Sequence, residues 1–192
     1  LHYAANLAVK GAAGEGTTGA AGAIDRITHE ILLSMEERKT LVVWLFDQTE
    51  SLIPQRQAIR DRFSKIYQEL GVVESTGNEA FAKHDNKPLI SSIVGFGNSV
   101  KFMTEKPTDN LADLKKAVAE LPKDDSGNEN VFTAIFEAAK RYASFRYSSG
   151  DKSSSDKPNP ERNVIIVVFT DEAGTDVSKS EETIRMCRRW AM

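Results

Sequence analysis

The sequence predicts an α/β fold: a three-layer, Rossmann-like, open and mostly parallel sheet with helices on both faces. Residues 41–46 and 164–169 are apolar throughout, as is typical of strands that are covered on both faces. Segments with apolar residues at helical spacing alternate with these runs along the chain, and this alternation favours a sheet covered by helices. We assign residues 40–192 to this domain and residues 1–39 to a preceding linker and helix.

The segment before the domain divides into two parts. Residues 11–23 are rich in glycine and alanine, which predicts a flexible linker. They lack the Gly-Lys-Ser/Thr ending of a phosphate-binding loop. Ile24, Ile27, Ile31 and Met35 then recur at helical spacing, so we expect an amphipathic helix that docks on the domain.

The first predicted strand is followed by a helix and a pair of strands. Pro54 suits the first turn of a helix. Residues 89–96 and 100–103 predict two strands, and Gly97-Asn98 between them predicts a hairpin.

Three helices and a second buried strand complete the predicted domain. Apolar residues between 111 and 121 predict a helix that ends at Pro122, and a longer helix is predicted over 131–145. The acidic loop between them, 123–130, is interpreted as solvated, with the rim of a site as the alternative. Residues 178–181, Ser-Lys-Ser-Glu, have capping-box spacing and predict the start of the last helix, after the strand.

The composition argues against several classes of function. The formal net charge is -3 and the basic residues are spread along the chain, so nucleic-acid binding is not predicted. No apolar run approaches the ~20 residues of a membrane-spanning helix. Cys187 is the single cysteine, so an intrachain disulfide is impossible and the compartment stays open. Because the chain starts at Leu1 without signal-peptide features, we expect a fragment of a longer protein.

Polar side chains follow both buried strands directly. Asp47, Thr49 and Ser51 come after the first strand, and Asp171 comes after the second. In an open α/β sheet the binding crevice lies beyond the carboxyl ends of the strands, so we expect these side chains to meet there. Carboxylate and hydroxyl oxygens are hard ligands that suit Mg²⁺. No histidine or cysteine lies near either strand end, so zinc is not indicated.

These residues carry a resemblance to a known family. The pattern Asp47-x-Thr49-x-Ser51, then Thr133 in NVFTAIFEAAKRY, then Asp171 in VIIVVFTDEAGTD, resembles the metal-ion-dependent adhesion site (MIDAS) of von Willebrand factor A (vWA) domains. The family's first motif is Asp-x-Ser-x-Ser, and Thr49 stands in place of the first serine. The resemblance covers roughly residues 40–192.

The resemblance implies a function as well as a fold. Mg²⁺, with Mn²⁺ or Ca²⁺ as alternatives, would be held directly by Ser51 and Thr49, with Thr133, Asp47 and Asp171 bonding directly or through water. An acidic side chain of a partner protein would complete the shell. The implied function is metal-dependent protein binding of the cell-adhesion type and not catalysis. It slightly favours an extracytoplasmic or membrane-attached location.

The chain also departs from the family pattern. Family members usually continue with two more strands and a final helix, whereas this chain ends near Trp190. We therefore expect a sheet that lacks the last strands and leaves one edge uncovered, where a homodimer could form or residues 24–39 could pack. Many members have glycine where this chain has Glu172.

Three other interpretations of the same residues stay open. Asp47, Thr49 and Ser51 could form a helix N-cap cluster without metal. A Mg²⁺ phosphohydrolase resembling the haloacid dehalogenase group would use Asp47 as nucleophile and Asp171 with Asp176 at the metal, although Thr49 stands where that group's phosphatases need a second aspartate. A metal-free interaction scaffold is the third possibility, if the Ser-to-Thr change has removed the site.

Overall fold

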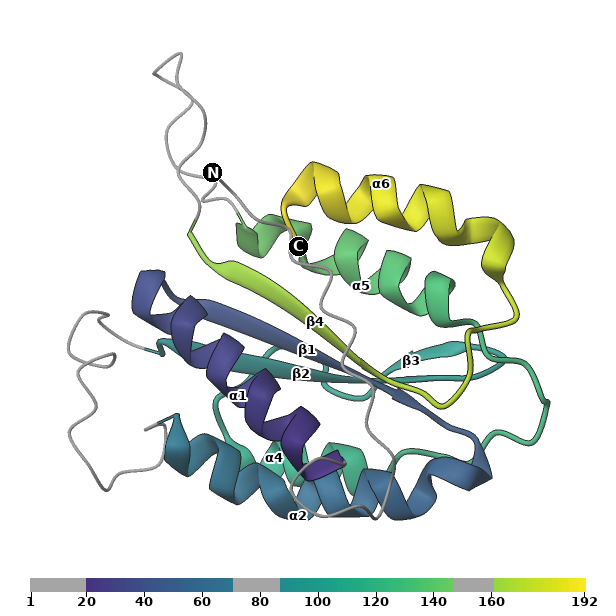
Figure 1. Ribbon diagram of the computed structural model, residues 1–192, viewed down its shortest axis with the longest axis horizontal. Helices are drawn as coiled ribbons and strands as arrows, with labels where there is room; N and C mark the ends of the chain where they lie inside the picture. Colours follow the sequence, from purple (N-terminus) through teal and green to yellow (C-terminus); the bar gives the residue numbers. More distant parts are fainter. Residues whose placement is uncertain (1–19, 71–86, 147–160) are drawn as a thin grey trace.

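The computed structural model describes residues 20–70, 87–146 and 161–192 (Figure 1). Most of the predicted linker and most of the predicted polar loops at 72–88 and 147–161 lie outside these residues.

The described residues form one four-stranded sheet, which confirms the predicted fold class. Its strands are β1 (Thr40–Asp47), β2 (Leu89–Phe96), β3 (Val100–Phe102) and β4 (Asn163–Phe169), in the order β3-β2-β1-β4. β1 pairs in parallel with both β2 and β4, and β3 pairs antiparallel with β2 as the predicted hairpin. β1 therefore lies between the other two parallel strands, and all eight of its residues are buried.

Helices cover both faces of the sheet, as the sequence predicts (Figure 1). One face carries α1 (Ala20–Glu37), α2 (Ile53–Glu69) and α4 (Leu111–Ala119), and the other carries α5 (Val131–Arg146) with α6 (Ser180–Trp190) outside it. A short 3₁₀ turn, Glu50–Leu52, joins β1 to α2, and Pro54 lies in the first turn of α2. No described helix is long and apolar enough to cross a membrane.

Successive β1 side chains enter opposite cores because a strand alternates its faces. Trp44 and its alternate neighbours Val42 and Phe46 pack with α1, α2 and α4, whereas Leu41, Val43 and Leu45 pack with α5. In the part of α1 from residue 23 onward, the buried residues are Ile24, Thr28, Ile31 and Met35. The predicted docking of an amphipathic helix on the domain is therefore confirmed.

β4 differs from the prediction of a doubly buried strand. Only Val164 and Val167 are buried in it, because β4 is the edge strand and has a neighbour on one side only. On the face that carries α1, Phe169 stacks on Phe46 at a ring-centroid distance of 5.0 Å and on Trp44 at 6.0 Å. These contacts hold the carboxyl end of β4 against β1.

The start of α6 also differs from the prediction. A 3₁₀ turn, Val177–Lys179, precedes α6. The N-cap residue of α6 is Lys179, which makes no side-chain cap hydrogen bond. The predicted capping box at 178–181 is therefore wrong. Because α6 packs on α5 and not on the sheet, Thr183 is its one fully buried residue, Ile184 is 40% exposed and Cys187 is half-buried.

Candidate metal site

The candidate site lies where β1 and β4 end side by side. Phe46 pairs with Phe169, so the residues that follow these two strands emerge at one edge of the sheet. Asp47 is fully buried there. Its Oδ1 accepts a hydrogen bond from the backbone N of Thr49 at 2.8 Å, and its Oδ2 accepts one from the Thr170 hydroxyl at 3.1 Å. Both carboxylate oxygens of Asp47 are therefore fixed in position.

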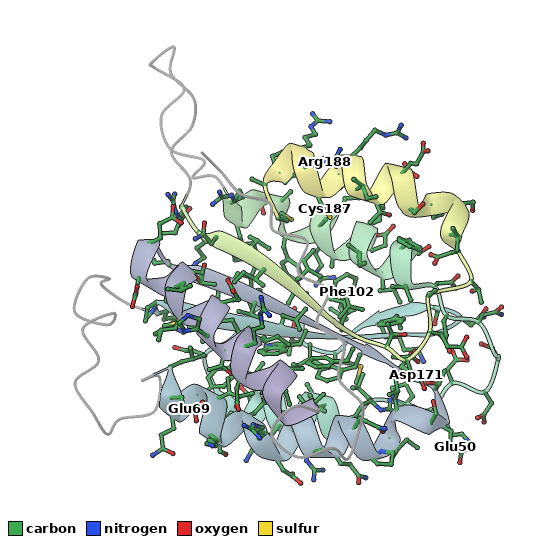
Figure 2. The ribbon with its side chains drawn as sticks, viewed as in Figure 1. Glu50, Glu69, Phe102, Asp171, Cys187 and Arg188 are labelled. Carbon is green, nitrogen blue, oxygen red and sulfur yellow. The ribbon has the colours of Figure 1, made fainter. Side chains whose placement is uncertain are left out.

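The hydroxyls of the loop after β1 reach the acid after β4. The Ser51 hydroxyl donates to Asp171 Oδ2 at 3.0 Å and lies 3.3 Å from the Thr49 hydroxyl. Figure 2 shows Asp171 and Glu50 at the same end of the molecule, with Glu69 at the opposite end of α2. The structure thus brings together four predicted residues, Asp47, Thr49, Ser51 and Asp171.

A third acid, Glu129, joins the cluster and was missed by sequence reasoning. Carboxylate oxygens of Asp47, Glu129 and Asp171 all lie within 4.8 Å of one another. Glu129 is 5% exposed, and its Oε2 is buried without a hydrogen-bond partner. The interpretation of 123–130 as wholly solvated is therefore wrong at this residue.

Backbone contacts explain how an acidic loop buries one of its acids. The backbone N of Glu129 donates to the Thr175 hydroxyl at 3.1 Å, and its carbonyl accepts from the backbone N of Thr175 at 2.8 Å. Thr175 lies 46 residues later, on the segment between β4 and α6. These hydrogen bonds join the loop before α5 to the segment between β4 and α6, and they hold Glu129 beside the ends of β1 and β4.

Thr133, the fifth predicted residue, lies in the first turn of α5 and bonds elsewhere. Its hydroxyl and its backbone N both donate to Asp176 Oδ2 at 2.6 Å. Asp176 Oδ1 also accepts from the backbone N of Phe132 at 3.1 Å. Asp176 therefore caps α5, since its carboxylate accepts from otherwise unpaired N–H groups of a helix start.

The surroundings of Glu129 in this cluster oppose its ionisation. Burial, together with the negative charges of Asp47, Glu172 and Asp171, raises the pKa of Glu129 from 4.5 to about 7. The fold therefore favours the protonated form of this carboxyl group. A cation at the cluster would relieve the same repulsion and give the buried Oε2 a partner.

The donor set favours a hard cation. The three acids and the Ser51 hydroxyl supply oxygen atoms alone, which suit Mg²⁺, Mn²⁺ or Ca²⁺. Zinc sites use histidine or cysteine, and the group that the described residues form contains neither. Buried acids, an orphaned oxygen and an exposed Asp171 thus fit a divalent cation approached from solvent.

Comparisons with known proteins give weak similarities of shape. No family model matches the sequence, and no curated protein matches it. The structure of proximal thread matrix protein 1 from the mussel byssus is similar with a TM-score of 0.48 and 16% identity, over 79% of this chain and 35% of that one. The three N-terminal domains of the type V pili tip protein Mfa5 from Porphyromonas gingivalis give a TM-score of 0.41 and 11% identity, over 73% and 22%. This chain spans about a third or less of those chains, and neither similarity bears on function.

Proposed function

We propose that this chain is a metal-dependent protein-binding module of the vWA type. Asp47, Ser51, Glu129 and Asp171 would hold Mg²⁺, and an acidic side chain of a partner protein would complete the shell. The observation that carries the proposal is the meeting of three carboxylates within 4.8 Å of one another, one of them with a buried and unpartnered oxygen. The bound cation would supply a positive centre in an otherwise negative region.

The burial of the proposed ligands indicates that the cation site would be open to solvent on one side only. Asp47 is fully buried and Glu129 is 5% exposed, so these two acids form the floor of the cluster. Asp171 and Ser51 are exposed, so solvent and a partner approach from their side. Without a cation the cluster and the exposed Glu172 would repel an acidic partner, which would make binding of that partner depend on the metal.

Calorimetric titration with Mg²⁺ and Mn²⁺ tests the cation site. We expect one saturable site in the wild type and an affinity at least about tenfold lower in Asp171→Asn, because this change removes a charge that faces the cation. Asp113→Asn, which changes another exposed acid, on α4, is the control and should leave the affinity unchanged. Equal affinity in wild type and Asp171→Asn would reject the site.

Partner recognition is tested with a short capped peptide that contains one aspartate. With Mg²⁺ present, we expect backbone NMR signals near Ser51 and Asp171 to shift on peptide addition, and EDTA to abolish these shifts. Shifts that persist in EDTA would show that the acidic group does not bind through the metal.

A phosphatase assay separates the proposal from the phosphohydrolase alternative. We expect no Mg²⁺-dependent hydrolysis of p-nitrophenyl phosphate above background. Turnover that disappears in Asp47→Asn would replace the binding function by catalysis at the same residues.

The role of Thr133 is tested by Thr133→Val, which keeps the shape of the side chain and removes the hydroxyl. Loss of the hydrogen bond to Asp176 should lower the free energy of unfolding by about 1–2 kcal/mol. The Mg²⁺ affinity should change less than about twofold, since the hydroxyl is already bonded to Asp176. Urea unfolding and calorimetry measure the two effects, and a tenfold loss of affinity would instead make Thr133 a metal ligand, as the vWA resemblance implies.

A further inference from the structure

A pocket of about 140 Å³ lies between α2 and α4. These helices pack side by side on the face of the sheet that also carries α1 (Figure 1). Apolar side chains that include Ile53, Val118 and Leu121 line the pocket together with cationic Arg56, Arg60 and Lys123. Because the volume is below the roughly 300 Å³ of a site for a drug-sized ligand, a small group fits it.

Arg56 is a buried cation of this pocket with an unsatisfied hydrogen-bond donor. It is 6% exposed, and its Nη1 is buried without a hydrogen-bond partner. No ion pair among the described residues involves it. Burial lowers its pKa and the charge of Asp47 opposes that effect, but both oxygens of Asp47 already accept other hydrogen bonds. An arginine stays protonated in proteins, so the buried guanidinium of Arg56 keeps a hydrogen-bond donor that no acceptor among the described residues satisfies.

The other two cations of the pocket have acidic partners. Lys123 pairs with Glu50 at 2.8 Å and with Asp125 at 2.9 Å. Arg60 pairs with Asp61 at 2.8 Å. Arg56 is therefore the pocket cation without an acid of its own, and Arg60 and Lys123 add to the positive field around it.

We propose that this pocket binds a carboxylate carried on a short aliphatic stem. A guanidinium matches a planar carboxylate with two parallel hydrogen bonds. The apolar side chains around Arg56 suit the stem, whereas a phosphate dianion would lose hydration against them without a partner for every oxygen. The proposal does not rest on the proposed function, since the residues that line this pocket lie on α2, on α4 and in the segment after α4, and none of them is a proposed metal ligand.

Sodium propionate in metal-free buffer, from which the chelator has been removed by dialysis, is the first probe, with sodium chloride at equal ionic strength as the reference. We expect the unfolding midpoint of the wild type to rise and saturate with propionate, with a Kd on the order of 1 mM for so small a ligand. Arg56→Gln should lose this rise. Arg62→Gln, a change on the same helix that removes an arginine paired with Asp25 and outside the pocket, should keep it.

NMR of the wild type provides a measurement that needs no variant. The Nε–H signal of Arg56 should shift in a saturable way with propionate, while that of Arg62 should not. A capped Gly-Glu-Gly peptide identifies the source of the carboxylate. A response to both probes supports an acidic side chain of a partner, and a response to propionate alone supports a free small acid.

Three results would overturn the proposal: no saturable response to propionate or to the peptide, an equal response in Arg56→Gln, or an Arg56 response to inorganic phosphate as strong as that to propionate. Because the buffer is free of divalent cations throughout, none of them depends on whether Asp47, Glu129 and Asp171 bind a cation.

Discussion

Replacing Glu129 with glutamine is expected to weaken Mg²⁺ binding while it stabilises the metal-free fold. The variant removes one of the three charges that face the cation, so Mg²⁺ affinity should fall at least about tenfold. It also removes a buried carboxyl group whose ionisation the fold opposes. In EDTA at pH 8, the free energy of unfolding should therefore rise by up to about 3 kcal/mol.

The raised pKa of Glu129 also makes the free energy of unfolding depend on pH. The pKa of Glu129 is about 7 in the fold against an ordinary value of 4.5, so between these values the folded chain keeps a proton that the unfolded chain has released. The contribution of this group is fully present below pH 4.5 and is lost as the pH rises through 7. Without metal, stability should therefore fall from pH 5 to pH 8.

Urea unfolding in EDTA across this range measures the slope. The wild type and a control variant, Glu137→Gln on α5, should lose stability with rising pH, and Glu129→Gln should lose much less. If Glu129→Gln had the slope of the wild type, Glu129 would not be the group that titrates.

Asparagine in place of Asp47 is expected to remove measurable cation binding, with a loss of more than about 100-fold. The change keeps the size of the side chain. The introduced asparagine can still accept from the backbone N of Thr49 through its side-chain carbonyl. Its amide can donate to the Thr170 hydroxyl, which also lies 3.1 Å from the carbonyl of Glu172 and can donate there instead. The local hydrogen bonds thus survive, and the lost charge is the main difference.

Calorimetry with Mn²⁺ and circular dichroism together measure this effect. Asp47→Asn should keep the spectrum of the folded wild type and give no binding heat, while Asp61→Asn on α2 should bind as the wild type does. An Mn²⁺ affinity within threefold of the wild type would rule Asp47 out as part of the site.

The order of the helices and strands could be predicted because each element is marked by a pattern of residues within its own segment of the sequence. The apolar runs of β1 and β4, the hairpin residues Gly97-Asn98 and the position of Pro54 each depend on neighbours in the chain. The edge position of β4 has no such signal. Its residues are as apolar as those of β1, and its lower burial depends on which strands lie beside it.

The site could be predicted in part for the same reason. Parallel neighbouring strands end at one edge, so Asp47 and Asp171 had to meet once β1 and β4 paired. Glu129 could not be selected, because in sequence it is one acid of a polar loop and its burial depends on Thr175. The vWA resemblance directed attention to Thr133, four residues further on, whose hydroxyl bonds to Asp176.

Crystals grown with Mn²⁺ test the central claim most directly. An anomalous difference map should show one strong peak among Asp47, Glu129 and Asp171, at about 2.1–2.3 Å from oxygens of the acids or of Ser51 that bind it directly. Asp171→Asn crystals grown in the same way should show a much weaker peak. Density for water alone at the cluster, with Glu129 hydrogen-bonded to a neighbour, would contradict a cation site at the ends of β1 and β4.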